Sequence, residues 1–529
     1  GDLEQARAAT LKAIELKPDH ADAYMNLGGI LKEQGDLEQA RAATLKAIEL
    51  KPNDLKKATA AKLFFSDLHE DFDHINRERE SYVNGITEIA RTPLEWERID
   101  QSCSTDMFWI AYHNKTDDKK ILESLGECLQ SACKNKAKDE TMPPERISAA
   151  GMPRIGICSD FLRNHTIGKL YSGIIRSLKQ KGFHLTILRG PDAKTDEASI
   201  SIDSLADASI RLPQSLAAAR EMVRRQELDL LLYPDIGMSP YTYMLALERL
   251  APIQATSWGH PNTTGLNTVD YFISSELIEP ADGQTQYTEQ LIKIAKLPCV
   301  YEHPQIKEIS SSRDRFRLPS NHCLIGIPQS LFKFHPDYDD VLEQIISRLP
   351  NARYVLIEGQ NKPQTDRLKA RWVKRAPATL ENTIFLPRMS QADYLCLLET
   401  VDLLLDPIYF GSGNTFYESM ALGTPLVTMP GDYMRGRIVA GGYKQMKLEN
   451  PPIAENIQDY IELTVRLAED AELRSQMKQE IKTAAQKHLF NDQEAVDEII
   501  EFIQAAVDEH RKTGGLLPVD WQSSRRRSL

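Results

Sequence analysis

Small residues gather at one point of the chain, in the stretch FGSGNTFYESMALGTP at residues 410–425. The apolar run before it predicts a β-strand that ends near Asp406, and the residues after its glycines predict a helix. The N-terminus of a helix presents unpaired N–H groups and a partial positive charge, and small residues let an anion approach them. The stretch therefore predicts a diphosphate-binding loop, with a helix merely capped by Asn414 or Thr415 as the alternative. The loop residues are Gly411, Ser412, Gly413, Asn414 and Thr415.

Two charged residues stand where they could complete such a site. Lys333 follows an apolar run at 323–330, and a lysine there can hold phosphate as a point charge. The alternative is an exposed surface lysine. Glu418 lies one turn into the predicted helix, where a carboxylate can accept hydrogen bonds from ribose hydroxyls. Its alternative role is to pair with the helix dipole.

Two histidines stand in loops after predicted strands in the first half of the chain. His165 and Thr166 lie in SDFLRNHTIGKL, and His260 and Pro261 lie in SWGHPNTTG. A histidine at such a place could act as a base, bind an acceptor or cap a helix, and a purely structural role is the alternative for His165. These four residues are the candidates for the acceptor side of a site.

Two stretches that are rich in acids and histidines could suggest a metal. The stretch HEDFDH at 69–74 predicts side chains scattered around a solvated helix, and HPDYDD at 335–340 predicts the capped start of a helix. We therefore expect that no metal is required.

The chain from residue 153 onward predicts two doubly wound α/β domains in tandem. Apolar runs alternate with helical stretches, which favours parallel sheets that are covered by helices. Ligands of such sheets bind beyond the carboxyl ends of the strands, so a tandem pair can form a cleft between them. The expected strands are 154–160, 184–190, 228–235, 252–258 and 271–275, followed by 323–330, 353–359, 383–388, 403–407 and 425–431.

The N-terminal part contains a repeat. Residues 1–18 recur identically at 35–52, and the pattern resembles the tetratricopeptide repeat, whose arrays bind extended peptides or proteins. We expect that these repeats are the end of a truncated array. Either a longer array precedes them, or helices within 58–137 pack on them as a cap. The clearest of these helices are predicted at 60–70 and 119–137. Oligomers could form through the repeats.

Composition narrows the functional class. The net charge of −12 argues against nucleic-acid binding, and no apolar run is long enough to span a membrane. The seven cysteines are scattered and include no C-x-x-C pair, which predicts reduced thiols, a cytoplasmic location and no zinc site.

Four stretches together resemble the protein O-GlcNAc transferases, the tetratricopeptide-bearing glycosyltransferases of family 41, in their bacterial form and of the SPINDLY type. The resemblance implies a GT-B fold of two Rossmann-like domains and an inverting, metal-independent transfer of one sugar from a UDP-sugar. The expected donor is UDP-GlcNAc, and the expected acceptor is a Ser or Thr hydroxyl of a protein. The stretches are SDFLRNHTIG, LAPIQATSWGHPNTTGLNTVDYFIS, PQSLFKFHPD and LLLDPIYFGSGNTFYESMALGTPLVTMPG.

The resemblance also implies roles for single residues. Lys333 matches the essential lysine on the diphosphate, Glu418 the ribose-binding acid, and His165 the histidine near sugar and acceptor. Tyr394 falls where the family places a residue against uracil. Ser330 stands where the animal enzymes carry a glutamine on the donor, and Gly413 replaces a histidine in the phosphate loop.

Alternatives remain open on these residues. The sequence GSGNT is closer to the bacterial cytoplasmic N-glucosyltransferases, which use UDP-glucose on asparagine. A nucleotide-binding scaffold without turnover and a nucleotide-sugar epimerase are further readings. The expected division is 1–57 repeats, 58–137 helical connector, 138–152 linker, 153–318 acceptor-side domain, 319–510 donor-side domain with closing helices, and 511–529 tail.

Overall fold

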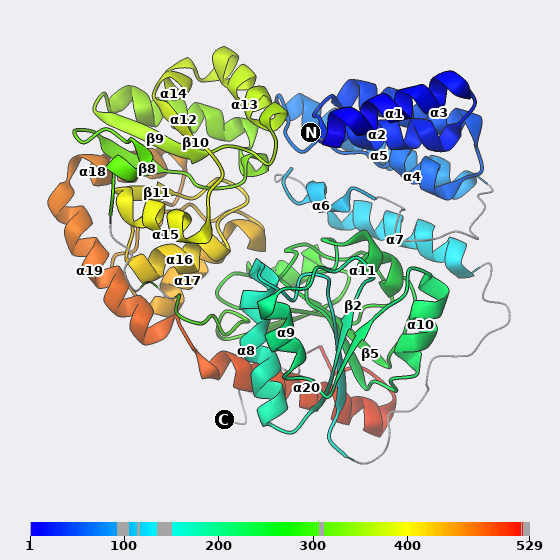
Figure 1. Cartoon of the computed structure of the whole chain (residues 1–529). Helices are drawn as coiled ribbons and strands as arrows, with labels where there is room; N and C mark the ends of the chain where they lie inside the picture. Colours follow the sequence, from blue (N-terminus) through cyan, green and yellow to red (C-terminus); the bar gives the residue numbers. More distant parts are fainter. Residues whose placement is uncertain are drawn as a thin grey trace.

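The computed structural model describes residues 2–92, 105–113, 117–134, 151–304, 306, 311–519 and 521. Helices form the N-terminal part, and two parallel sheets that are covered by helices follow it (Figure 1). Most of the predicted linker and the end of the predicted tail lie outside the described residues. None of the described helices combines the length and the apolar character that crossing a membrane requires.

The first three helices are antiparallel neighbours that share a small core. Gly28 lets two of them approach closely, because a Cβ atom there would lie 2.5 Å from Cγ2 of Thr44. The side chains of His20 and Asp36 cap the second and third helix. These helices are α1 (Asp2–Leu16), α2 (Ala21–Glu33) and α3 (Leu37–Leu50).

The connector that follows is only partly helical. The helix predicted at 60–70 is wrong, because α4 ends at Lys62 and the chain then runs irregularly to Asp71. The N–H of Phe65 binds Asp106, and that of Ser66 binds Glu78. Carboxylates from elsewhere thus replace the carbonyl acceptors that a helix would supply. The connector helices are α4 (Leu55–Lys62), α5 (Phe72–Arg91), α6 (Met107–Ile110) and α7 (Lys119–Lys134).

The first sheet is parallel and has the strand order β3-β2-β1-β4-β5-β6-β7. All five strands expected in this series are present. The short edge strands β3 and β7 were not predicted; β3 alternates between exposed and half-buried residues and so lacks an apolar run. The strands are β1 (Arg154–Cys158), β2 (His184–Arg189), β3 (Ala208–Arg211), β4 (Leu230–Tyr233), β5 (Ile253–Ser257), β6 (Tyr271–Ser275) and β7 (Gln290–Ile294), and the helices between them are α8 (Thr166–Gln180), α9 (Glu197–Asp203), α10 (Leu216–Arg224) and α11 (Pro240–Ala246).

The second sheet is parallel with the order β10-β9-β8-β11-β12, and all five of its strands were expected. The chain builds β8, β9 and β10 in one direction and then returns to place β11 on the other side of β8. The strands are β8 (Cys323–Gly326), β9 (Ala352–Ile357), β10 (Thr383–Leu386), β11 (Leu403–Leu405) and β12 (Leu426–Val427), and the helices are α12 (Pro336–Arg348), α13 (Lys362–Arg375), α14 (Pro377–Glu381), α15 (Gln391–Thr400), α16 (Asn414–Leu422), α17 (Ile438–Met446), α18 (Ile457–Glu469) and α19 (Ala471–His488).

The last helix, α20 (Gln493–Thr513), crosses back and packs on the first sheet (Figure 1). The ring of Phe502 lies 5.2 Å from that of Tyr271, and the hydroxyl of Tyr271 accepts the N–H of Leu517. The predicted division assigned residues 493–510 to the second domain. In the structure they complete the first, because α20 covers apolar side chains of β5 and β7.

The N-terminal helices dock on the second domain through α13, which lies beside them in Figure 1. Asp67 accepts hydrogen bonds from Gln364 and Arg367, and the carbonyl of Glu33 accepts one from Asn361. Arg371 donates to the carbonyl of His69. The connector is therefore attached to the domain that carries the predicted phosphate loop.

Candidate active site

The predicted loop and the predicted lysine lie at a point where the strand order of the second sheet reverses. Lys333 belongs to a short 3-10 helix, η4 (Leu331–Lys333), that follows β8, and residues 410–415 follow β11. Because β8 and β11 are hydrogen-bonded neighbours, their carboxyl ends meet. Such a reversal is where open α/β sheets bind ligands.

Lys333 is anchored beside the loop by neutral groups. Its Nζ atom donates to the carbonyl of Gly411 at 2.8 Å and to Oε1 of Gln329 at 2.9 Å, and it lies 4.9 Å from the ring centre of Phe410. Burial lowers the pKa of Lys333 to about 8, and Asp406 opposes this shift. Among the described residues no carboxylate forms an ion pair with this ammonium, so its charge is available to an anion.

Buried polar groups hold the loop from behind. Asp406 accepts the N–H of Ser412 at 2.6 Å and the hydroxyl of Thr428 at 2.8 Å. Gln329 donates to the hydroxyl of Ser412 at 2.9 Å while it accepts from Lys333. The predicted site did not include Asp406 or Gln329. A polar residue directly after an apolar strand was the signal that could have found each of them.

The start of α16 is open. Its N-cap is Gly413, so the alternative of a helix capped by Asn414 or Thr415 is wrong. Asn414 instead accepts a hydrogen bond from the hydroxyl of Tyr301, and the hydroxyl of Thr415 lies 2.7 Å from that of Tyr394. Among the described residues no atom lies within 4 Å of a Cβ placed on Gly413. The first N–H groups of α16 therefore have no side-chain cap and border free space.

Glu418 links a helix of the second domain, α16, to a helix of the first, α8. Its Oε1 atom accepts from Nζ of Lys169, on α8, at 2.9 Å and from Nε2 of Gln391 at 2.7 Å. Its Oε2 atom is buried and has no hydrogen-bond partner among the described residues. The ion pair brings the first turn of α8 beside the first turns of α16, although the two residues are far apart in the sequence. Neither Lys169 nor Gln391 was predicted.

His165 caps α8, and Thr166 is the first residue of that helix. The Nδ1 atom of His165 accepts the N–H of Ile167 at 3.3 Å. Burial lowers the pKa of His165 to about 4, with smaller contributions from Arg163 and Lys169. The ring is therefore neutral at pH 7. Because Nδ1 is an acceptor, we assign the proton to Nε2.

His260 lies in an aromatic group beside Lys333. Its ring stacks on Phe108 at 5.7 Å, and Phe108 contacts Phe332, the neighbour of Lys333, at 6.1 Å. Burial lowers the pKa of His260 to about 3, so this side chain is neutral. Trp109, Tyr112 and Phe410 extend the same aromatic group.

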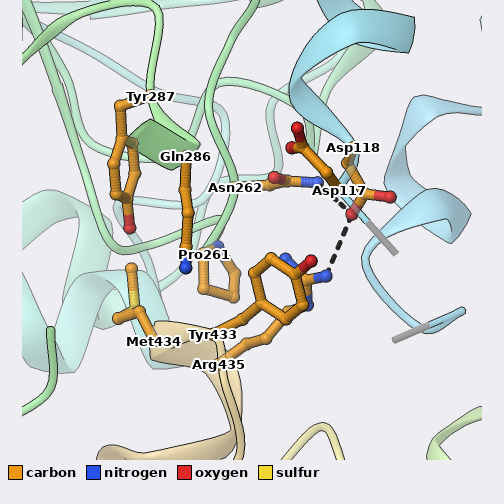
Figure 2. A pocket seen from close by; sticks show the side chains of 9 residues that line it. All are labelled: Asp117, Asp118, Pro261, Asn262, Gln286, Tyr287, Tyr433, Met434 and Arg435. Carbon is orange, nitrogen blue, oxygen red and sulfur yellow. Dashed lines mark hydrogen bonds and ion pairs between the residues drawn. The ribbon is translucent and has the colours of Figure 1, made fainter. Parts of the chain in front are cut away.

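Pro261 lines a small pocket where three parts of the chain meet (Figure 2). Figure 2 shows Arg435 and Asn262 pointing toward Asp118, whose carboxylate accepts from each of them at 3.0 Å. The carbonyl of Arg435 accepts the N–H of Gly411. Arg435, which lines this pocket, thus holds the backbone of the phosphate loop in place. Its other lining residues are Asp117, Gln286, Tyr287, Tyr433 and Met434.

Ser330 and Tyr394 occupy the rim of the same region. Ser330 is exposed, and its carbonyl accepts the N–H of Lys333 at 3.0 Å. Tyr394 is half-buried next to Thr415. The structure therefore brings Lys333, residues 411–415, Ser330, Tyr394 and Glu418 together, and Lys169 connects them to His165 and Thr166.

Two family models match the chain. Residues 299–499 match glycosyl transferase family 41, and residues 21–54 match a tetratricopeptide repeat. The first match covers β8 to β12 with their loops, and the second covers α2, α3 and the turn after them.

Curated relatives include glycosyltransferases of bacteria and plants. A UDP-glucose:protein N-beta-glucosyltransferase of Actinobacillus pleuropneumoniae serotype 5b is 24% identical over 60% of this chain and 50% of its own length. A probable UDP-N-acetylglucosamine–peptide N-acetylglucosaminyltransferase SPINDLY of Solanum lycopersicum is 26% identical over 45% of this chain and 26% of its own. The chain thus spans half or less of the length of these relatives.

One solved structure resembles the whole chain. A mutant of the Thermobaculum terrenum O-GlcNAc transferase is 19% identical, with a TM-score of 0.76 over 97% of this chain and 96% of the other. The two proteins share the arrangement of N-terminal repeat helices and two Rossmann-like domains, so the predicted GT-B fold is confirmed.

Proposed function

We propose that this chain, whose residues 299–499 match glycosyl transferase family 41 and whose residues 21–54 match a tetratricopeptide repeat, is an inverting, metal-independent protein glycosyltransferase. It moves one sugar, GlcNAc in the first instance, from a UDP-sugar to Ser or Thr hydroxyls. Protein or peptide acceptors bind along the groove of the repeat helices. The alternative donor and acceptor are UDP-glucose and Asn, which the name of one relative favours.

The observation that carries this proposal is the pairing of Lys333 with the open start of α16. Negative charge collects on the diphosphate as its bond to the sugar breaks. Within the described part of the chain, Lys333 forms no ion pair with a carboxylate and no side chain caps the first N–H groups of α16, so both are preorganised donors for that charge. The buried Oε2 atom of Glu418 has no hydrogen-bond partner among the described residues, which makes Glu418 the candidate to accept a ribose hydroxyl while Oε1 keeps Lys169.

We assign His165 the role of a hydrogen-bond donor. A general base must offer an unprotonated nitrogen to the acceptor hydroxyl. In the observed arrangement the unprotonated nitrogen of His165 already accepts the N–H of Ile167, and its Nε2–H is the group that is left to bind sugar or phosphate. The general base of the reaction is therefore not assigned to this residue.

A donor comparison tests the proposal directly. Purified protein is incubated with UDP-GlcNAc or UDP-glucose and a cell lysate, UDP release is measured, and modified peptides are identified by fragment mass spectrometry. We expect UDP release with UDP-GlcNAc and a hexosamine on Ser or Thr. Release with UDP-glucose and a hexose on Asn would establish the alternative. Nucleotide binding without release from either donor would favour a scaffold.

The affinity for UDP is expected to fall as the pH rises above about 8. Burial lowers the pKa of Lys333 to about 8 in the free protein, and the diphosphate binds the charged form and raises that pKa in the complex. Between the two pKa values, each pH unit weakens binding ~10-fold. Calorimetric titrations across this range measure the slope, and they are interpretable because the phosphates of UDP are already ionised there.

The matched control for this titration is Lys333→Arg, which keeps its charge at every pH used. Its UDP affinity is expected to be independent of pH, whatever its absolute value. A pH-independent affinity in the unmodified protein would contradict the assignment of Lys333 to the diphosphate.

A further inference from the structure

Three buried side chains from three segments of the connector converge away from the phosphate loop. His69 lies in the irregular segment after α4, Glu78 lies on α5, and His113 follows α6. One nitrogen of each histidine and one oxygen of Glu78 all lie within 4.8 Å of one another. The prediction that residues 69–74 form a solvated helix face is wrong for His69, which precedes the helix and is 7% exposed. We propose that His69, Glu78 and His113 bind a zinc ion that holds the connector together.

Among the three side chains, His113 has the hydrogen-bonding potential that the protein satisfies least. It is fully buried, and neither ring nitrogen has a hydrogen-bond partner among the described residues. A buried polar group without a partner is costly, so native proteins rarely keep one. The ring packs edge-on to that of His69 at 4.6 Å, which brings the two imidazoles together. A metal bond would satisfy one nitrogen.

Glu78 is held in the manner of a metal ligand. Its Oε1 atom accepts the hydroxyl of Ser66. The N–H of Ser66 donates to Oε2 at 3.0 Å and to Oε1 at 3.3 Å, and Oε2 also lies 3.0 Å from Nε2 of His69. Supporting hydrogen bonds of this kind orient the carboxylates that bind metals. Arg371 fixes the backbone of His69 by donating to its carbonyl at 2.7 Å.

The chemistry of the three donors favours zinc. Two imidazoles and a carboxylate suit Zn²⁺, which takes nitrogen and oxygen ligands in tetrahedral sites. The fourth position is open to water or to His74, whose Nε2 atom lies 3.3 Å from Oε1 of Glu78. A groove between the N-terminal helices and α13 is lined by His69, His74 and Glu78, and it gives an ion a route to the site.

The surrounding charges permit a cation. Arg79 and Arg371 are guanidinium groups near the two rings, and each is already paired with a buried carboxylate, Arg79 with Asp118 and Arg371 with Asp339. Glu78 is the carboxylate that faces the ion, and its contacts with His69 and His74 are the ones that the ion would replace.

Zinc at this place would be structural. It would tie the segment after α4 and helix α5 to the turn that carries Tyr112, and the ring of Tyr112 stacks on Phe410 at 4.3 Å. Phe410 in turn lies against Lys333. The ion would thus stabilise the aromatic side chains that pack against Lys333, and it would not itself contact a reacting group.

The test uses the full chain after it has been stripped with a chelator. Zn²⁺ is titrated in by calorimetry, bound metal is counted by elemental mass spectrometry, and X-ray absorption identifies the ligand atoms. We expect one tightly bound zinc and a first shell of nitrogen and oxygen at ~2.0–2.1 Å. Failure to retain zinc against a weak competitor, or a shell that contains sulfur at ~2.3 Å, would overturn the proposal.

Two variants and a control locate the site. His113→Phe keeps an aromatic ring among its aromatic neighbours, and Glu78→Gln keeps the shape of the side chain. Each is expected to weaken zinc binding at least ~10-fold, whereas His322→Ala, in a different domain, leaves it unchanged. Unchanged affinity in both folded variants would also overturn the proposal. If neither variant folds, the absorption spectrum of the unmodified protein decides.

Discussion

Replacing Lys333 by alanine is expected to lower the rate of sugar transfer by ~10²–10³-fold while the fold survives. The described hydrogen bonds of its ammonium go to Gly411 and Gln329, and the buried Asp406, whose charge it faces, keeps its bonds to Ser412 and Thr428 when the lysine is removed. The variant loses a positive charge beside the uncapped N-terminus of α16, where negative charge collects on the leaving diphosphate. The measurement is UDP release at saturating donor, together with circular dichroism to check the fold.

The matched control is Lys369→Ala. The ammonium of Lys369 also lies over a phenylalanine ring, that of Phe385, at 4.4 Å, but on a helix outside the phosphate loop. Its loss is expected to leave the transfer rate unchanged. Turnover close to that of the unmodified protein in Lys333→Ala would remove Lys333 from the reaction and with it the main support for the proposed function.

Replacing Arg371 by methionine is expected to destabilise the protein by ~3 kcal/mol, since it leaves the buried carboxylate of Asp339 with the longer contact to Arg375, at 3.7 Å, as its ionic pair among the described residues. Asp339 is fully buried and accepts both of its ionic hydrogen bonds from Arg371, at 2.7 and 2.8 Å. The same guanidinium holds the carbonyls of His69 and Phe334. Unfolding by urea, followed by intrinsic fluorescence, measures the loss.

A second variant separates the charge from the shape. The double variant Arg371→Met/Asp339→Leu removes both charges and is expected to recover most of the lost stability, because an apolar pair often replaces a buried ion pair without loss. Arg348→Ala breaks an exposed pair with Glu462 and is expected to change the unfolding midpoint little. A double variant as unstable as the single one would show that the carbonyl contacts, and not the charge, matter most.

The parts of the site that sequence could predict are those in which local pattern and chemistry coincide. The apolar run before Asp406, the glycines after it and the amphipathic run beyond them predict a strand, a loop and a helix within a short stretch. Lys333 follows a strand in the same way. Each of these signals depends on neighbours in the chain, so the loop and the lysine could be found without knowing the fold.

The parts that sequence could not predict depend on distant partners. Glu418 pairs with Lys169, on a helix of the first domain, and nothing near either residue in the sequence indicates the other. The irregular segment after α4 has the composition of a helix, but Asp106 and Glu78 bind its N–H groups. The N-cap of α16 fell on Gly413 because Tyr301 and Tyr394 engage the hydrogen-bonding side chains of Asn414 and Thr415.

The return of α20 to the first sheet sets the order in which a newly made chain can become complete. A ribosome finishes β7 at Ile294 but reaches α20 only at Gln493, which at ~5–20 residues per second is a delay of roughly 10–40 s. During that interval the second sheet and its helices can fold, while the face of the first sheet around Tyr271 is not yet covered by α20. Of the two sheet domains, the one translated first is thus the last to be completed, and its exposed face is a surface that a chaperone could hold.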